Sequence, residues 1–220
     1  MQEVPTQAKQ PTRLTARGAQ TRSRIVSTAA QLMRAQGAGA TTLDDVVRAS
    51  GVSKSQLYSH FADKTALVRA VVEYIGELKV GGERERLSKV KSFAGLKRWR
   101  DALIANNALE QGRYGCALGS LANEVADHDA VARAQLSALF TAWGELFEDV
   151  LRRFQRQGLI PEDADVGQLA TALLAAVQGG YLLAQTARDV APMASAVDTA
   201  LAHLQLLSST STSTDIRRKS

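Results

Sequence analysis

The sequence has little cysteine and little proline, and both shortages limit the possible folds. A single cysteine, Cys116, stands among 220 residues, so an internal disulfide framework is excluded and a reducing compartment is indicated. Of the four prolines, only Pro161 and Pro192 lie beyond residue 11, which leaves long stretches where a helix can run uninterrupted. Aromatic residues make up only 5 %, whereas alanine and leucine are abundant in the second half. These proportions predict an all-α protein.

Long apolar runs are also missing. No run of 18 apolar residues occurs, so we expect no membrane-spanning segment and no membrane partner. The N-terminal stretch "MQEVPTQAKQPTRLTARGAQTRSR" has no apolar core of the kind that a secretion signal needs. We therefore expect a cytoplasmic protein, whose length suffices for one large domain or two small ones.

The motifs of common enzyme classes are absent as well. The chain has neither a "GxxxxGKS/T" phosphate loop nor a "GxGxxG" turn after a strand. His60, His128 and His203 are isolated, without the paired spacing of metal ligands. The stretch "DHD" at 127–129 predicts a loop followed by a helix cap. We therefore predict no enzyme, no metal and no cofactor.

Positive charge is concentrated in the first third of the chain. The formal charge is +5, but residues 1–70 hold ten Lys and Arg against four Asp and Glu, a net of +6. Residues 71–220 hold 17 and 18, a net of −1. A basic end can serve solubility alone, but an excess confined to one segment is also typical of a module that binds a polyanion such as nucleic acid.

The first 80 residues predict four helices. Ile25, Ala29, Leu32 and Met33 form the apolar stripe of a first helix, which we expect to begin near Thr21 and to end at "QGAGATT".

Two short helices follow. Thr42, with Asp45 three residues later, predicts the N-cap of a second helix, which Gly51 closes in a left-handed conformation. Ser53 predicts the N-cap of a third helix of about two turns, and Asp63 the cap of a longer fourth that extends to residue 78. Two short helices around a tight turn, braced on both sides, predict a helix-turn-helix.

The glycine-containing stretch "KVGGERERLSK" predicts a break, and five further helices are expected near 93–111, 115–127, 129–157, 166–188 and 192–207. We expect a second core of about 120 residues here. The predicted organisation is a flexible basic arm (1–18), a helix-turn-helix DNA-binding domain (19–80), a larger helical ligand-binding and dimerisation domain (81–207) and a disordered tail (208–220).

The segment "SKSQLYSHF" separates into two faces when it is placed on a helix. Leu57 and Phe61 lie four residues apart on the inner face, and polar side chains cover the rest. A helix in the major groove needs phosphate contacts for position and amide or hydroxyl groups for base edges. Gln56 suits adenine, and the lysines suit phosphates. The predicted DNA-binding residues are Thr42, Ser53, Lys54, Ser55, Gln56, Tyr58, Ser59, His60 and Lys64.

The stretch "TTLDDVVRASGVSKSQLYSHFADKTAL" resembles the DNA-binding segment of the TetR (tetracycline-repressor) family of bacterial transcriptional regulators. That family typically shows a Thr, a short helix, "A-x-G-V-S" and then "Y-x-H-F-x-x-K-x-x-L". The chain supplies Thr42, Ala49, Gly51, Val52, Ser53, Tyr58, His60, Phe61, Lys64 and Leu67 in register. It departs at Ser55, where many members have Gly, and at Val47-Arg48, where "I-A" is commoner. The departure at Ser55 leaves operator identity open.

The resemblance implies an all-helical homodimer that binds double-stranded operator DNA and most often represses until a small molecule releases it. In the family the dimer forms through the last two long helices, here near 166–188 and 192–207. Small residues on the first of these allow close helix approach. Packing within one chain is the alternative.

Polar and aromatic groups interrupt the apolar pattern of the middle helices, where we expect a pocket for a small hydrophobic or aromatic effector. Core packing is the alternative for each of them. The candidates are Trp99, Asn106, Tyr114, Cys116, Trp143, Phe147, Gln178, Tyr181 and Gln185.

Cys116 opens the run "GCALGSL", which resembles the start of the corresponding helix in many family members. A thiol at a helix start can be reactive, which would make a redox sensor, or it can be a small buried hydrophobe. The other alternative is a regulator with the same domains that responds to a protein partner, or one that activates transcription.

Overall fold

The computed structural model describes residues 15–109, 113 and 115–218, and in these residues every regular element is a helix, which confirms the all-α prediction. The elements are α1 (Ala16–Gln36), α2 (Leu43–Ser50), α3 (Lys54–His60), α4 (Lys64–Ser88), α5 (Phe93–Leu109), α6 (Ala117–Val125), α7 (Ala130–Arg156), α8 (Val166–Ala187) and α9 (Ala191–Arg218).

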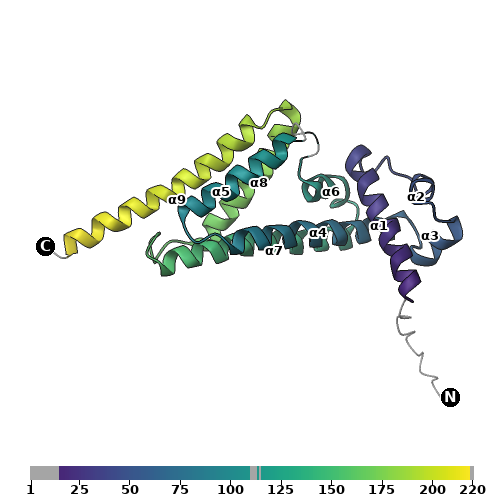
Figure 1. The fold of residues 1–220 in the computed structure, drawn as a ribbon, viewed down its shortest axis with the longest axis horizontal. Helices are drawn as coiled ribbons and strands as arrows, with labels where there is room; N and C mark the ends of the chain where they lie inside the picture. Colours follow the sequence, from purple (N-terminus) through teal and green to yellow (C-terminus); the bar gives the residue numbers. More distant parts are fainter. Residues whose placement is uncertain (1–14, 110–112, 114, 219–220) are drawn as a thin grey trace, which may run out of the picture.

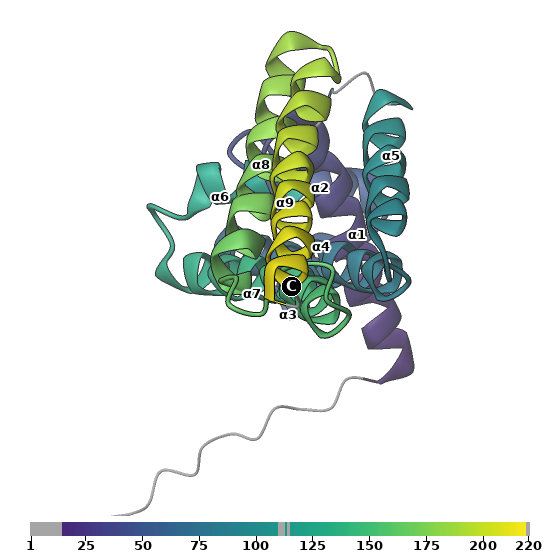
Figure 2. The same cartoon turned by 90° about the vertical axis from the view of Figure 1, so that its left-hand side faces the viewer.

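The helices form two groups that share α4 (Figure 1). At one end, α1 packs on α2, α3 and the first half of α4. From there α4 runs along α7, which packs on α8, and α9 contacts both α8 and α5 (Figure 2). The short α6 lies between the groups and contacts α4 and α7. A shared α4 means that a change in one group can reach the other through a single rigid element.

Capping side chains begin the helices around the turn as predicted. Thr42 Oγ1 accepts from Asp45 N at 3.1 Å while Asp45 Oδ2 accepts from Thr42 N at 3.0 Å, which is a complete capping box. Ser53 forms a second capping box at the start of α3, and the Asp63 side chain caps α4 by accepting from Ala66 N. Gly51, at φ +67°, closes α2 in the left-handed region, where a residue with a Cβ atom is strained.

The first helix begins earlier than predicted. It starts at Ala16, with Thr15 as N-cap, rather than near Thr21. Thr15 Oγ1 accepts from Gly18 N at 3.2 Å, a cap that the apolar stripe alone does not reveal because it lies before the first buried residue. The last part of the expected arm is therefore helical, and its residues 1–14 lie outside the described part of the chain.

The predicted break after residue 78 is wrong, because α4 continues through Gly81 and Gly82 to Ser88. Two interior glycines cost a helix roughly 2 kcal/mol together. Burial of Val80 and Leu87, which continue the inner face of α4 on both sides of the glycines, offsets that cost.

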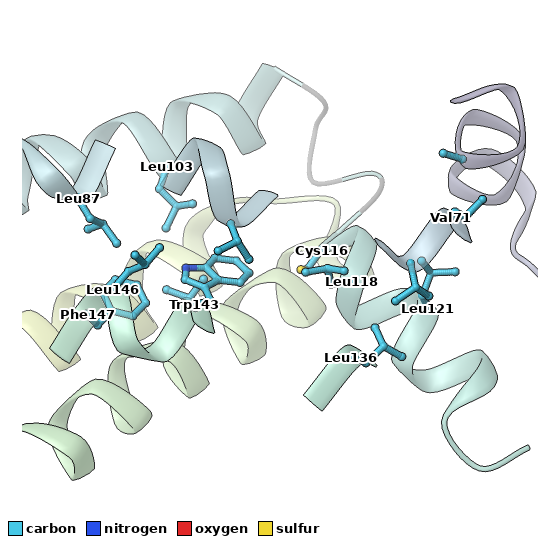
Figure 3. Packing of buried hydrophobic residues seen from close by; sticks show 14 of the residues in the cluster. Val71, Leu87, Leu103, Cys116, Leu118, Leu121, Leu136, Trp143, Leu146 and Phe147 are labelled. Carbon is cyan, nitrogen blue, oxygen red and sulfur yellow. The ribbon is translucent and has the colours of Figure 1, made fainter. Parts of the chain in front are cut away.

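Close packing of α4 on α7 occurs at Gly76. A Cβ atom at this position would lie 2.3 Å from Leu139 Cδ1 on α7, so only glycine allows this approach without movement of the leucine. The core beyond it is apolar and includes Trp143, Phe147 and Phe154, each with no exposed area. Figure 3 shows the first two among leucines of neighbouring helices.

The five C-terminal helices lie where they were predicted, except that α9 is longer. It runs from Ala191 to Arg218, although the Ser/Thr-rich composition predicted a disordered tail from residue 208. Extending a helix that already exists needs only local hydrogen bonds, whereas starting one is costly.

Helix α8 is also long and apolar enough to cross a membrane by length and composition, although no uninterrupted run of 18 apolar residues predicted it. Its packing on α7 and α9 makes it a core helix of the second group.

Candidate DNA-binding surface and interior polar cluster

Helix α3 turns one buried side chain, Leu57, inward and leaves the rest of its length on the surface. Its N-cap, the N-cap of α2 and the start of α4 lie at the same end of the molecule (Figure 1). Tyr58 is 54 % exposed although it is a large aromatic residue. Of the predicted residues, His60 and Lys64 are half-buried, and seven are exposed, namely Thr42, Ser53, Lys54, Ser55, Gln56, Tyr58 and Ser59.

The two predicted phosphate-binding lysines differ in their partners. Lys54 Nζ lies 2.8 Å from Asp44 Oδ1, and both side chains are more than 60 % exposed. An ion pair this exposed contributes little to stability, so a phosphate can replace the carboxylate. Lys64 Nζ donates instead to the backbone carbonyl of Gly39 at 2.7 Å, which ties the start of α4 to the loop before α2. Lys54 is therefore the more accessible of the two lysines to a phosphate.

Gln56 has a structural role that its sequence position did not reveal. Its Oε1 atom accepts from Ser53 N at 2.9 Å, while Ser53 Oγ accepts from Gln56 N at 3.1 Å. This capping box holds the first turn of α3. A bidentate contact to adenine uses both the oxygen and the nitrogen of the amide, so Gln56 would have to leave the cap to make it.

A fully buried carboxylate, that of Glu83 on α4, lies at the centre of a polar cluster in the second group of helices. Its Oε1 atom accepts from Lys79 Nζ at 3.2 Å and from Arg86 Nη1 at 3.0 Å. Its Oε2 atom accepts from the indole Nε1 of Trp99 on α5 at 3.0 Å. Three donors therefore compensate a charge that burial alone would make very unfavourable.

Lys79, one turn before Glu83, lies between two aromatic rings. Its Nζ atom is 4.7 Å from the ring centroid of Trp143 on α7 and 5.4 Å from that of Tyr181 on α8. It also donates to Tyr181 Oη at 3.3 Å. Burial works to lower the pKa of Lys79, but Tyr181 and Glu83 outweigh it and hold the pKa above its ordinary value. Lys79 is therefore a cation at neutral pH.

Helix α6 borders the same cluster. Cys116, 7 % exposed, is the N-cap residue of α6, and its side chain points toward Trp143 in Figure 3. A Cβ atom on Gly119 would lie 3.2 Å from Gln178 Oε1, so α6 packs directly on α8. Within the described ranges, Trp143 Nε1 and Gln178 Nε2 are buried without a hydrogen-bond partner. Unpaired buried donors are unfavourable, and a bound acceptor would satisfy them.

The other end of α6 touches the DNA-binding helices. Glu124 Oε2 accepts from Gly39 N at 2.8 Å, so Gly39 is held on both sides, by Glu124 and by Lys64. A second link joins Arg69 on α4 to Asp129, the N-cap of α7, through two hydrogen bonds of 2.8 and 2.9 Å. The hydrogen bond from Arg69 lowers the pKa of Asp129 to about 2, so this link is fully charged at neutral pH.

Two known families match the chain, one over the N-terminal group of helices and one over the C-terminal group. Residues 25–71, which hold α2, α3 and parts of α1 and α4, match the family described as bacterial regulatory proteins, tetR family. Residues 93–199 match the C-terminal domain of LmrA/YxaF-like transcriptional regulators. The chain belongs to the TetR family. Its members are helix-turn-helix transcriptional regulators that bind operator DNA and not enzymes, which confirms the resemblance and the predicted class.

Individual proteins that are similar to this TetR-family regulator align with most of its length. The HTH-type transcriptional regulator Rv0196 of Mycobacterium tuberculosis is 29 % identical over 179 residues, 78 % of this chain and 88 % of its own. The regulatory protein TetR from Rhodobacter sphaeroides has the same fold, with a TM-score of 0.75 at 20 % identity over 83 % of this chain and 98 % of its own. The SmeT–triclosan complex has a TM-score of 0.63 at 25 % identity, covering 84 % and 91 %.

The polar cluster brings together six of the nine predicted effector residues, namely Trp99, Cys116, Trp143, Phe147, Gln178 and Tyr181. Phe147 joins it by edge-to-face contact with Trp99 at 5.3 Å. Gln185 lies nearby against Gly115, and Tyr114 lies outside the described residues.

Asn106 is exposed on α5, and its place in an effector pocket stays a prediction. Its neighbour Asn107 is buried and donates to Met193 Sδ at 3.1 Å.

Sequence reasoning missed Lys79 and Glu83. Both belong to the stretch that was interpreted as a helix break. A signal was present nonetheless, because Val72, Gly76, Val80 and Glu83 follow the three- and four-residue spacing of a buried stripe.

Proposed function

We propose that this TetR-family regulator is a homodimeric repressor that a small ligand, bound in the interior polar cluster, releases from a palindromic operator. The observation that carries the proposal is the position of α6. Its first residues border the cluster at Cys116 and Gly119, and its last turn bonds to Gly39 through Glu124. A ligand that displaces α6 would act directly on the loop before α2.

The unpartnered face of α8 supports the dimer. Leu182 and Leu183 are more than half exposed, and on α9 Leu206 is 65 % exposed. Large apolar side chains that are exposed on these two helices favour burial against a second copy. The exposed positions of α8 follow helical spacing along one side and are Gln168, Thr171, Ala172, Ala175, Gly179, Leu182, Leu183, Thr186 and Ala187.

Two recognition helices must meet successive major grooves, about 34–36 Å apart, for both half-sites to be bound. A ligand that changes this separation needs about 5 kcal/mol of preference for the non-binding state to switch occupancy from nearly full to nearly empty. The similar structure of SmeT is a complex with triclosan, which supports a small molecule as the effector of this regulator too.

The Lys54→Ala variant should weaken binding to operator and random DNA about equally, because phosphates carry no sequence information. The slope of log K against log salt concentration should fall by about 0.9, the value for one phosphate. Fluorescence anisotropy on DNA flanking the gene, and on a random fragment of equal length, measures both quantities. Failure of the unaltered protein to bind any flanking fragment at low salt would refute the proposed function.

Lys64→Ala is the matched comparison. Because its ammonium group is bound to the Gly39 carbonyl, its removal should leave the salt slope nearly unchanged. Equal slopes for the two variants would show that the assignment of Lys54 as the phosphate ligand is wrong.

Glu124→Ala should weaken operator binding about tenfold by releasing Gly39, since a hydrogen bond to a charged group contributes about 1.5 kcal/mol. Hydrogen exchange at the Gly39 amide should accelerate in the same variant. Asp127→Asn, an exposed acidic residue just beyond α6, is the control and should change neither quantity. Unchanged operator affinity together with faster exchange would exclude α6 as the connection to the DNA-binding helices.

A further inference from the structure

The interior cluster carries one uncompensated positive charge. Lys79 and Arg86 share the single carboxylate of Glu83, which has no exposed area. Arg86 reaches the surface, where its side chain is 48 % exposed, whereas that of Lys79 is 24 % exposed. The charge enclosed between the rings is therefore that of Lys79, whose pKa lies above its ordinary value.

The unpaired hydrogen-bonding groups around Lys79 also favour an anion, because they are donors. Within the residues that the structure describes, Trp143 Nε1 and Gln178 Nε2 lack partners, and both are donors. The Trp143 side chain is fully buried, and its ring is one of the two that the Lys79 ammonium group contacts. Gln178 lies one turn before Tyr181, the other ring partner. The site therefore has one more positive than negative charge, and it has two donors for which no acceptor is present among the described residues.

We propose that the ligand of this site is a small aromatic anion, a carboxylate or a phenolate, whose oxyanion binds Lys79 and Gln178 and whose ring lies among Trp99, Trp143 and Tyr181. This inference rests on the proposed function, because it names the chemical class of the effector. The oxyanion replaces the 3.3 Å hydrogen bond between Lys79 and Tyr181 and accepts from the free amide of Gln178. A hydrogen bond between an ammonium group and an oxyanion is stronger than the ammonium–hydroxyl bond that it replaces.

A cationic ligand is the competing class, since aromatic rings also bind ammonium groups. Here the rings already hold Lys79, and a second cation would raise the net charge of the cluster from +1 to +2. It would also leave the donors of Trp143 and Gln178 unsatisfied. Both effects oppose a cation and favour an anion.

A ligand that binds beside Gln178 would also explain how binding releases the operator. The start of α6 rests on the glutamines of α8, since a Cβ atom on Gly115 would lie 2.6 Å from Gln185 Oε1 and one on Gly119 lies 3.2 Å from Gln178 Oε1. A ring placed between these helices separates α6 from α8. The same helix holds Gly39 through Glu124.

Three probes with one ring system test the class: 2-naphthoate, neutral 2-naphthamide and cationic 2-naphthylmethylammonium. Calorimetry on the full chain should show 2-naphthoate binding at least about tenfold more tightly than the other two. The chain has two tryptophans, and both line the site, so two-dimensional NMR of the indole N–H groups reports binding directly. The Trp143 signal should shift with 2-naphthoate.

The Lys79→Met variant should lose the preference for 2-naphthoate over 2-naphthamide, while Lys89→Met, at the exposed end of α4, should keep it. The probe series uses the unaltered protein, so it decides the question even if Lys79→Met does not fold. Equal or tighter binding of the amide or the amine, or no binding by any probe, would overturn the anion assignment. If 2-naphthoate binds and shifts the indole signal but operator affinity stays unchanged, the ligand class holds and the release mechanism fails.

Discussion

Leu182→Arg should convert the regulator from a dimer to a monomer and reduce operator affinity about a hundredfold or more. Leu182 is 55 % exposed on the unpartnered face of α8, and in a twofold interface the change occurs once in each chain. Two arginines would then be desolvated against apolar surface without a carboxylate partner. Light scattering should give a mass of 23.6 kDa in place of twice that value.

The loss of operator affinity follows from the loss of the second DNA-binding unit. Two linked units gain about 10²- to 10⁴-fold over one, through effective concentration alone. Leu109→Arg is the matched control, because Leu109 is an 84 % exposed leucine on α5 and not on the open face of α8, and its replacement should leave mass and affinity unchanged. A monomeric Leu182→Arg variant with full operator affinity would show that DNA binding does not need the dimer.

Glu83→Ala should destabilise the fold by about 3–5 kcal/mol, because it leaves Lys79 and the Trp99 indole without their buried partner. For a chain of this length that loss lowers the melting temperature by roughly 10 °C. Thermal unfolding followed by circular dichroism measures it.

Glu85→Ala provides the control within the same helix. Glu85 pairs with Lys89 at 2.8 Å with the same four-residue spacing, but both side chains are at least 70 % exposed. Solvent screens such a pair, so its loss should leave the melting temperature almost unchanged. Similar effects of the two substitutions would mean that burial of Glu83 is not what makes its ion pair important.

The helix-turn-helix was predictable because its signals act over three or four residues. The capping boxes at Thr42 and Ser53, the left-handed Gly51 and the cap at Asp63 all occur where the sequence indicated them. Each involves a side chain and a backbone group within one turn, so no distant contact is needed to form it. The role of Gln56 in the cap escaped prediction because a surface amide suits both a helix start and a base edge.

The interior cluster was only half predictable. Aromatic and amide residues interrupting an apolar pattern pointed to Trp99, Trp143, Gln178 and Tyr181, which do converge. Lys79, which holds the charge between the rings, comes from a stretch whose glycines predicted the end of a helix. The packing of α4 against α7 stabilises the helix beyond these glycines, so α4 continues to Ser88.

Local chemistry along the chain is therefore enough to establish the helical class, the starts of the helices around the turn and the DNA-binding motif, because hydrogen bonds within one turn do not depend on the rest of the protein. Packing between distant helices decides which charges are buried, where α6 contacts Gly39 and which side of α8 stays open. Those outcomes depend on groups far apart in sequence, such as Glu124 and Gly39, whose proximity no short pattern encodes.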